Sequence, residues 1–143
     1  MNILGIGTDI VECIRIARMI ERHGELFLRK VFTAREIAEC NTRKRATEHF
    51  AARWAAKEAI FKALGMNWRG PVGWTDLEIR QEGVGKPTVH VGGNGKELLQ
   101  QLRVADILVS FAFSRQYATA YALVMSRPKT KVVPPTPDED VPF

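Results

Sequence analysis

The longest helical pattern in the sequence constrains the fold more than any other feature. It begins after Thr47 and ends at Gly65, a residue type that commonly follows the last turn of a helix. At about 100° per residue, one arc of this helix carries large apolar side chains, namely Phe50, Trp54, Phe61 and Leu64. The segment is therefore predicted to pack one apolar stripe against the core.

The neighbouring arc of the same helix carries a carboxylate and an ammonium one turn apart. Glu58 and Lys62 lie there beside Ala51 and Ala55, whose small side chains let another segment or a ligand approach closely. A Glu and a Lys four residues apart are common on helices and contribute only about 0.3 kcal/mol. Spacing alone therefore favours an ordinary surface ion pair over a functional site.

Shorter patterns before and after this helix predict the fold class. Residues 3–7 have the pattern of a short buried strand, with glycines where another backbone can approach, and Thr8 and Asp9 end it. Helical patterns follow over residues 10–22 and, after a capping box of Thr33 and Glu36, over residues 34–40. Beyond the long helix, we expect strands at residues 77–80, 88–91, 107–113 and 117–125, and a short helix at 96–103. The prediction is an α+β fold in which helices pack on an antiparallel β-sheet.

The 143 residues suit one domain with a short extension. Residues 1–126 contain every helical and strand pattern, whereas residues 127–143 hold five of the seven prolines and mixed charge, which predicts an extended or disordered tail. No apolar run reaches the roughly 18 residues of a membrane span, and no signal-peptide pattern occurs. We therefore expect a cytoplasmic protein without a membrane partner, in which Cys13 and Cys40 are free thiols.

The net charge of +5 is carried by the first half of the chain. Residues 1–70 hold 13 Lys and Arg against 8 Asp and Glu, whereas residues 71–143 hold 8 of each. A basic surface predicts an anionic partner, either a nucleic acid, a phosphorylated cofactor or an acidic protein, unless it is only a solvated face. No nucleic-acid-binding motif occurs, so we expect no nucleic acid partner.

Two further features each allow two interpretations. Asp9 with Glu12 could cap the following helix, or Asp9 could be a carboxylate at a strand end that binds a hard cation together with Glu58. The turn Gly85-Lys86-Pro87 could be only a tight turn with a solvated lysine, or a basic turn near a phosphate. The spacing of these residues does not decide between the two interpretations of either feature.

Two motifs in this order resemble the holo-acyl-carrier-protein synthases, a family of phosphopantetheinyl transferases. Residues 5–12, GIGTDIVE, followed by Arg15 and Ile16, are similar to the opening motif of that family. Residues 50–65, FAARWAAKEAIFKALG, are similar to its central motif. Further matches at residues 32–36, 74–79 and 85–87 extend the resemblance over about residues 1–125.

The resemblance implies a fold that agrees with the α+β prediction, a reaction and a set of site residues. Family members move the phosphopantetheine arm of coenzyme A to a serine of an apo acyl carrier protein. Asp9 and Glu58 match the Mg²⁺ ligands, Lys62 would stabilise the leaving group on the same phosphates, and Glu58 or a metal-bound water could accept the serine proton. The positions that match contacts to coenzyme A are Arg53, Lys57, Lys62, Gly85, Lys86 and Pro87.

The resemblance also implies partners. Arg15 matches the position that grips the acidic helix of the carrier, and four residues could help it on charge alone: Arg18, Arg22, Lys44 and Arg45. Relatives of this small type form homotrimers with active sites between subunits, so a homotrimer is expected here.

One position departs from the family pattern. Where the family has Val-Ser-Ile-Ser/Thr-His before Tyr-Ala, this chain has Ala112 and Phe113 before Tyr117 and Ala118. Phenylalanine cannot bind phosphate or move a proton, and Phe113 shares its strand face with the core-type residue Val109. The departure favours an alternative function, a non-catalytic relative that binds coenzyme A or the carrier.

Overall fold

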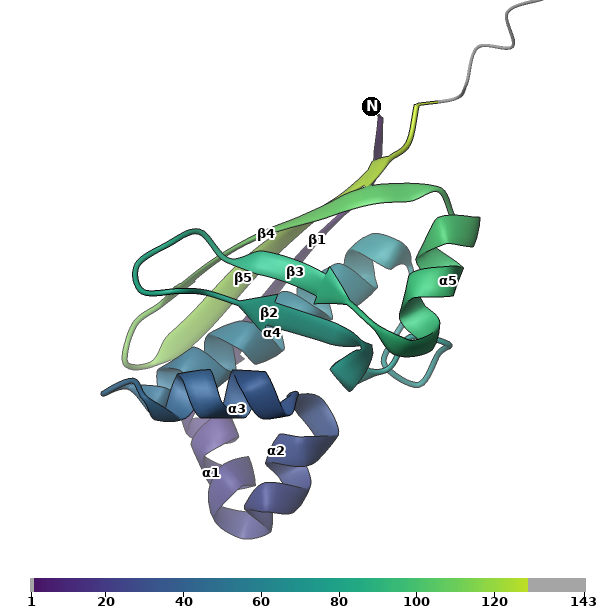
Figure 1. Cartoon of the computed structure of the whole chain (residues 1–143). Coiled ribbons are helices and arrows are strands. Elements are labelled where there is room, and N and C mark those ends of the chain that lie inside the picture. The colour runs from purple at the N-terminus through teal and green to yellow at the C-terminus, as the bar shows by residue number, and fades with distance from the viewer. Residues whose placement is uncertain (1, 129–143) are drawn as a thin grey trace, which may run out of the picture.

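The computed structural model describes residues 2–128 and forms two antiparallel sheets and five α-helices in that range (Figure 1). The order along the chain is β1 (Ile3–Glu12), α1 (Cys13–His23), α2 (Glu25–Val31), α3 (Ala34–Asn41), α4 (Ala46–Leu64), a 3₁₀ turn (Trp74–Asp76), β2 (Leu77–Arg80), β3 (Thr88–Val91), α5 (Gly93–Gln101), β4 (Val104–Phe113) and β5 (Tyr117–Ser126). This confirms the predicted α+β class. The predicted tail at 127–143 lies, apart from its first two residues, outside the described range.

The larger sheet has the strand order β1-β5-β4, so the first and last strands of the domain are neighbours. The smaller sheet is the hairpin of β2 and β3. Helix α4 crosses the inner face of the larger sheet, while α1, α2 and α3 gather at one end of the molecule (Figure 1). The first motif of the sequence, on β1, therefore lies directly against the second, on α4.

Helix α4 is buried on nearly every side, so the prediction of a single core stripe is wrong. Its alanines are as inaccessible as its aromatic residues, because β1 and β5 pack on one side and α1, α3 and β2 on others. Gly5 and Gly7 explain the close approach of β1: a Cβ on either would overlap a backbone carbonyl oxygen of α4, that of Ala63 or Ala59. The predicted role of these glycines is thereby confirmed.

Strand β1 runs to Glu12, five residues beyond the predicted end, and α1 begins only at Cys13. Asp9 therefore lies inside a strand paired with Ala120, and its interpretation as a helix cap is wrong. Glu12 occupies the cap position without a side-chain cap bond. Sheet pairing with β5 continues through Thr8 and Asp9, and this long-range pairing is not readable from local residue types.

Other helix ends agree with the prediction from neighbouring residues. The capping box of α3 is confirmed, with the Thr33 N–H donating to Glu36 Oε1 at 2.9 Å and the Glu36 N–H donating to Thr33 Oγ1 at 3.2 Å. Gly65 adopts the left-handed conformation after α4, with φ of 68°. In contrast, α2 was not predicted, and α5 begins three residues before its predicted start.

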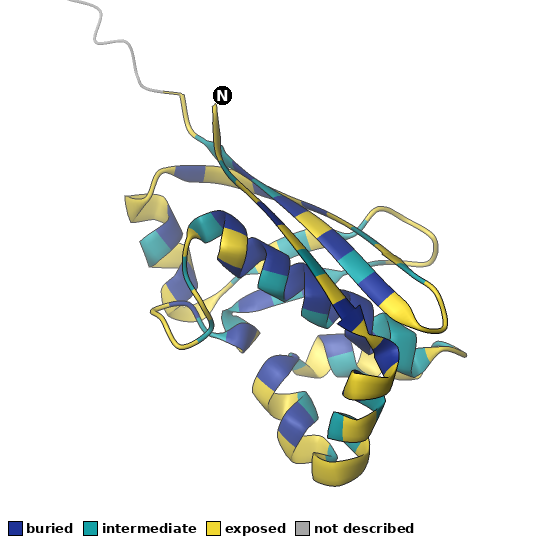
Figure 2. Ribbon diagram, turned by 180° about the vertical axis from the view of Figure 1, so that it is seen from behind, coloured by how far each residue is buried: buried dark blue, intermediate teal, exposed yellow. Residues whose placement is uncertain are grey.

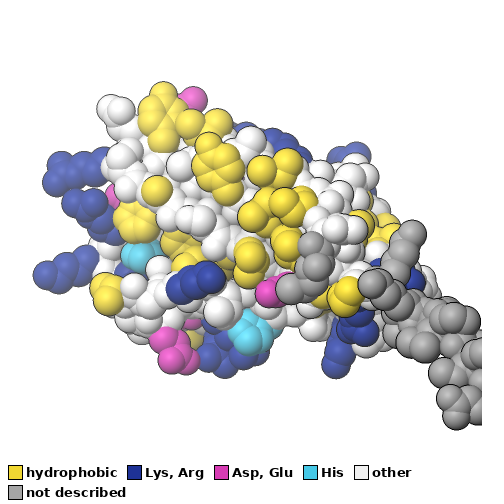
Figure 3. All heavy atoms as spheres, turned by 90° about the horizontal axis from the view of Figure 1, so that it is seen from above, with side chains coloured by type: hydrophobic (Ala, Val, Ile, Leu, Met, Phe, Trp, Pro, Cys, Tyr) yellow, Lys and Arg dark blue, Asp and Glu magenta, His cyan; other side chains and the backbone are white. Residues whose placement is uncertain are grey.

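The outer face of the larger sheet is apolar and exposed (Figures 2 and 3). Ile6 and Ile10 of β1 are 68% and 66% exposed, and Tyr121 of β5 is 57% exposed. The alternate residues of β5, from Ala118 to Val124, are buried, as are Gly7 and Val11 of β1, in keeping with the strand period. A monomer thus exposes several large apolar side chains on one sheet face, a feature that usually marks an interface.

Candidate active site

The crossing of β1 and α4 brings together three residues that the sequence analysis selected. Lys62 Nζ lies 2.9 Å from Asp9 Oδ1 and donates a second hydrogen bond to the Thr8 carbonyl at 3.1 Å. Glu58 stands one turn before Lys62 on the same helix, and burial and then the charge of Asp9 raise the pKa of Glu58. Residues 53 positions apart in the chain therefore form one charged cluster.

The two carboxylates have spare capacity for a cation. Asp9 Oδ2 is buried and has no hydrogen-bond partner among the described residues. Burial raises the pKa of Glu58, and the Asp9 carboxylate raises it further, while Lys62 and Arg15 oppose both effects. A divalent cation between the carboxylates would satisfy the orphaned oxygen and offset their repulsion.

The donors at this site are carboxylate oxygens, which are hard ligands. Within residues 2–128, no group of three or more His, Cys, Asp or Glu side chains could hold a metal ion. Mg²⁺ is commonly held by one or two carboxylates, with the other ligands coming from phosphates and water. Asp9 and Glu58 fit that pattern.

Arg15 extends the cluster toward α1. Its guanidinium carbon lies 5.4 Å from the ring centroid of Trp54, and its charge offsets part of the rise in the pKa of Glu58 that burial and Asp9 cause. Arg18 and Arg22 are exposed on the same helix, so α1 presents a basic surface beside the carboxylates. Lys44 and Arg45 are also exposed but belong to the connection between α3 and α4.

Lys57 and Arg53 do not fit the prediction that they contact donor phosphates. Both side chains have zero exposure, and association with further chains can only reduce exposure. The Lys57 ammonium donates to three protein oxygens: Glu36 Oε1 at 2.6 Å, the Val31 carbonyl at 2.7 Å and the Trp74 carbonyl at 2.9 Å. Its three N–H groups are thus all used inside the protein, and burial lowers its pKa against the opposing effect of Glu36.

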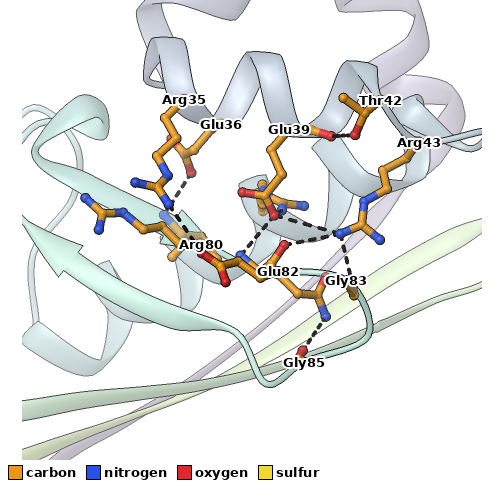
Figure 4. Close-up of polar contacts among 12 residues, drawn as sticks. Arg35, Glu36, Glu39, Thr42, Arg43, Arg80, Glu82, Gly83 and Gly85 are labelled. Atoms are coloured by element: carbon orange, nitrogen blue, oxygen red, sulfur yellow. Dashed lines mark hydrogen bonds and ion pairs between the residues drawn. The ribbon is translucent and has the colours of Figure 1, made fainter.

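The predicted basic turn is accessible. Gly85 and Lys86 are exposed, and the Gly85 carbonyl accepts a hydrogen bond from Gln81 Nε2 at 3.0 Å (Figure 4). A cavity of about 470 Å³ next to the turn is lined mainly by polar residues, namely Arg35, Arg80, Glu82, Gly85, Lys86, Thr88 and His90.

Sequence reasoning missed three basic residues of this cavity: Arg35, Arg80 and His90. The sequence pattern could have indicated two of them, Arg80 and His90. Strand alternation puts Arg80 and His90 on the face opposite the buried residues of β2, which is also the face beside the turn. Arg35 comes from α3, and only tertiary packing brings it there.

Phe113 lies at the edge of the hydrophobic core. It is half-buried against the main cluster, and its ring centroid lies 4.8 Å from that of His49 in an edge-on arrangement. Burial, and next the charge of Arg53, lower the pKa of His49. The expectation that Phe113 packs as a core residue is confirmed.

Comparisons with known proteins agree over nearly the whole described range. The model of the 4′-phosphopantetheinyl transferase superfamily matches residues 5–122. A holo-[acyl-carrier-protein] synthase of Rhodopirellula baltica is 46% identical over 124 residues, which cover 87% of this chain and 98% of that protein. The corresponding protein of Koribacter versatilis is 43% identical over 122 residues, covering 85% of this chain and 98% of the relative.

Solved structures show the same fold. A holo-[acyl-carrier-protein] synthase of Neisseria meningitidis superimposes with a TM-score of 0.81 at 30% identity, covering 87% of this chain and all of the other. A Bacillus anthracis synthase in complex with CoA (3′,5′-ADP) has a TM-score of 0.72 at 31% identity, covering 87% of this chain and 98% of that one. None of the helices among the described residues is both long and apolar enough to span a membrane.

Proposed function

The chain belongs to the 4′-phosphopantetheinyl transferase superfamily, and on this premise we propose that it is a holo-acyl-carrier-protein synthase. It transfers the 4′-phosphopantetheine arm of coenzyme A to a serine of an apo acyl carrier protein and releases adenosine 3′,5′-bisphosphate. The observation that supports this best is the meeting of Asp9, Glu58 and Lys62 where β1 crosses α4. Phosphoryl transfer depends on such positioned charges, because charge must be stabilised on both the attacking and the leaving oxygen.

Asp9 and Glu58 are the residues that would hold Mg²⁺. Their carboxylates supply hard oxygen ligands, and one oxygen of Asp9 is buried without a partner. When bound, Mg²⁺ would neutralise charge on the pyrophosphate of coenzyme A.

Lys62 and Glu58 have separate roles in the transfer. The serine oxygen forms a bond to phosphorus while the phosphoanhydride bond breaks, and the electron pair of that bond leaves with adenosine 3′,5′-bisphosphate. The Lys62 ammonium stabilises this leaving phosphate. Burial and Asp9 raise the pKa of Glu58 toward the range that suits a proton acceptor, so Glu58 can take the serine proton.

The nucleotide half of coenzyme A binds at the turn of residues 85–87. Lys86 is exposed there, and the neighbouring cavity has two arginines, Arg35 and Arg80, against one carboxylate, Glu82. Phosphate groups are favoured at such a site because several cations share their charge.

The acidic carrier docks on α1. Arg15, Arg18 and Arg22 lie on this helix, and Arg15 is the one nearest to Glu58, which a docked serine must reach. Lys44 and Arg45 could extend the contact on charge alone.

The active molecule is a homotrimer, in which the exposed sheet face is buried. This face includes Ile6, Ile10 and Tyr121, and a monomer would leave it in water. The buried free thiols of Cys13 and Cys40 suit the reducing cytoplasm, where we place the protein.

A second candidate function is binding of coenzyme A or the carrier without transfer. Phe113, where the family pattern has histidine, packs against His49 and offers no polar group to a ligand. The charged cluster of Asp9, Glu58 and Lys62 opposes this alternative, because a protein that only binds has less use for it.

Intact-mass spectrometry tests the two functions. Apo acyl carrier protein is incubated with the protein, coenzyme A and Mg²⁺, and parallel reactions contain EDTA or the Glu58→Ala variant. A gain of one phosphopantetheine arm that both controls abolish supports the transferase. Coenzyme A binding with no mass gain on several carriers would instead support the non-catalytic relative.

A further inference from the structure

The buried ion pair of Lys57 and Glu36 continues into the backbone of β2. Lys57 Nζ lies 2.6 Å from Glu36 Oε1, and the other oxygen, Oε2, accepts the N–H of Ile79 at 3.0 Å. All three groups are inaccessible to solvent. We call Lys57, Glu36 and Ile79 the first row.

A second row runs parallel to the first. Arg53 Nη2 lies 2.8 Å from Glu39 Oε1, and the same oxygen accepts the N–H of Gln81 at 3.0 Å. The side chain of Arg53 is fully buried, like that of Lys57. Each row therefore joins a cation of α4, a carboxylate of α3 and an amide of the segment formed by β2 and the residue that follows it.

The spacing within each element explains why two rows form. Arg53 and Lys57 are one turn apart on α4, and Glu36 and Glu39 are about one turn apart on α3. The amides of Ile79 and Gln81 point to the same edge of the strand, because successive amides of a strand point to opposite edges. The carboxylates of α3 thus satisfy the edge of β2 that no strand within residues 2–128 pairs.

Further hydrogen bonds connect Gln81 of the second row to the nucleotide-binding turn. Arg43 Nη2 donates to the Gln81 carbonyl at 3.2 Å and to the Gly83 carbonyl at 3.0 Å, and Gln81 Nε2 donates to the Gly85 carbonyl (Figure 4). At the other end of the rows, Lys57 directly precedes Glu58. The rows therefore connect the helix that carries the metal-binding carboxylate with the turn that carries Lys86.

We propose that Arg53, Lys57, Glu36 and Glu39 are positioning residues that hold the nucleotide-binding turn in a fixed place relative to Glu58. This rests on the proposed function and assigns these residues a role other than contact with coenzyme A. The cations hold the carboxylates in place through ion pairs, and the carboxylates fix the backbone of β2 by accepting its amides. Fixed placement of the two halves of a site lowers the entropic cost of binding the donor across both.

Two double variants of the second row separate positioning from direct contact. Glu39→Gln with Arg53→Met removes both charges but keeps a carbonyl oxygen that can accept the Gln81 N–H. Glu39→Leu with Arg53→Met removes the same charges and the acceptor as well. Neither variant leaves a fully buried charge without its partner, which is the change that most often prevents folding. Arg43, 3.9 Å from Glu39, loses that carboxylate equally in both variants, so the comparison between them isolates the acceptor.

The measurement is binding of adenosine 3′,5′-bisphosphate by calorimetry, with KM for coenzyme A and kcat from the transfer assay. We expect the Gln variant to bind like wild type and the Leu variant to bind about tenfold more weakly, equivalent to about 1.4 kcal/mol. KM for coenzyme A should rise by the same factor in the Leu variant with kcat little changed. Amide hydrogen exchange at Gln81 should be faster in the Leu variant only.

Two outcomes would overturn the proposal. Equal weakening in both variants would mean that the lost charges, and not the acceptor for the Gln81 N–H, matter for nucleotide binding. Wild-type binding in both would mean that the second row does not position the turn. If the Leu variant does not fold, Glu36→Gln and Glu36→Leu, each with Lys57→Met, make the same comparison on the first row. Glu25→Gln, which breaks the exposed Glu25–Arg29 pair on α2, is the matched control and should change nothing.

The wild-type protein distinguishes failure of this inference from failure of the proposed function. A wild type that neither binds the nucleotide nor modifies any carrier refutes the function itself. A wild type that does both, with a Leu variant equal to it, refutes only the positioning role.

Discussion

The Lys62 ammonium lies 2.9 Å from Oδ1 of Asp9, which joins the last turn of α4 to the middle of β1. Lys62 remains about half exposed, whereas the Asp9 carboxylate is largely covered. The pair is therefore open on the lysine side, where an anionic ligand can approach the ammonium. An ion pair of this kind is a poor source of stability and a good binding point for a phosphate.

Replacing Lys62 by Met should lower kcat by about 100-fold, because a charge that stabilises the leaving phosphate is lost. Melting temperature should also fall, because the largely covered Asp9 carboxylate loses its ion-pair partner, so rates are compared well below it. Initial rates of carrier modification by mass spectrometry measure the effect. Lys96→Met, at an exposed lysine of α5, is the control. Equal rates for wild type and Lys62→Met would remove Lys62 from the mechanism.

The raised pKa of Glu58 predicts how stability depends on pH. A carboxyl group whose pKa is higher in the folded protein binds its proton more tightly there, so its ionisation costs stability as pH rises from about its ordinary 4.5 through the raised value. Without metal, Glu58→Gln should therefore be more stable than wild type at pH 7, and the difference should vanish below about pH 4.5.

At pH 7, Mg²⁺ should make wild type more stable than Glu58→Gln. Binding to the native state raises the melting temperature of wild type, and the variant lacks one of the two carboxylates. Thermal unfolding at pH 4 and pH 7, with and without Mg²⁺, measures both effects. Equal stabilisation of wild type and Glu58→Gln by Mg²⁺ would contradict the assignment of Glu58 as a ligand.

Gly7→Ala should destabilise the fold by about 2 kcal/mol or more, because the new Cβ would overlap the Ala59 carbonyl oxygen of α4. Chemical denaturation gives the free energy of unfolding. Gly73→Ala is a matched control, since φ there is −91° and its Cβ would make only an ordinary contact with Asp76. Two variants of equal stability would show that β1 can move away from the helix at little cost.

Tyr121→Glu should convert the trimer to a monomer, because a charge would be placed at the centre of the apolar sheet face. Size-exclusion chromatography with light scattering should give about three times 16.1 kDa for wild type and one times that mass for the variant. Leu26→Glu, at an apolar residue of α2 that is more exposed, should leave the mass unchanged. A monomeric wild type would refute the trimer directly.

The sequence predicted the roles of some site residues better than those of others. Asp9, Glu58 and Lys62 were selected because they lie in two long motifs, although local spacing alone favoured ordinary roles for them. Arg53 and Lys57 lie in one of those motifs too, yet they are buried. Side-chain type indicates a charge but not its partner, and their partners on α3 are 14 and 21 residues away in the chain.

The sequence by itself determined the features that depend on neighbouring residues. The capping box of Thr33 and Glu36, the end of α4 at Gly65 and the alternation of the strands all follow from contacts or periods within a few residues. Only the tertiary structure decided that β1 extends through Asp9, that α4 is enclosed on nearly every side and that Lys57 faces Glu36. These outcomes depend on strand pairing and burial between distant segments, where the free energy of packing overrides local preference.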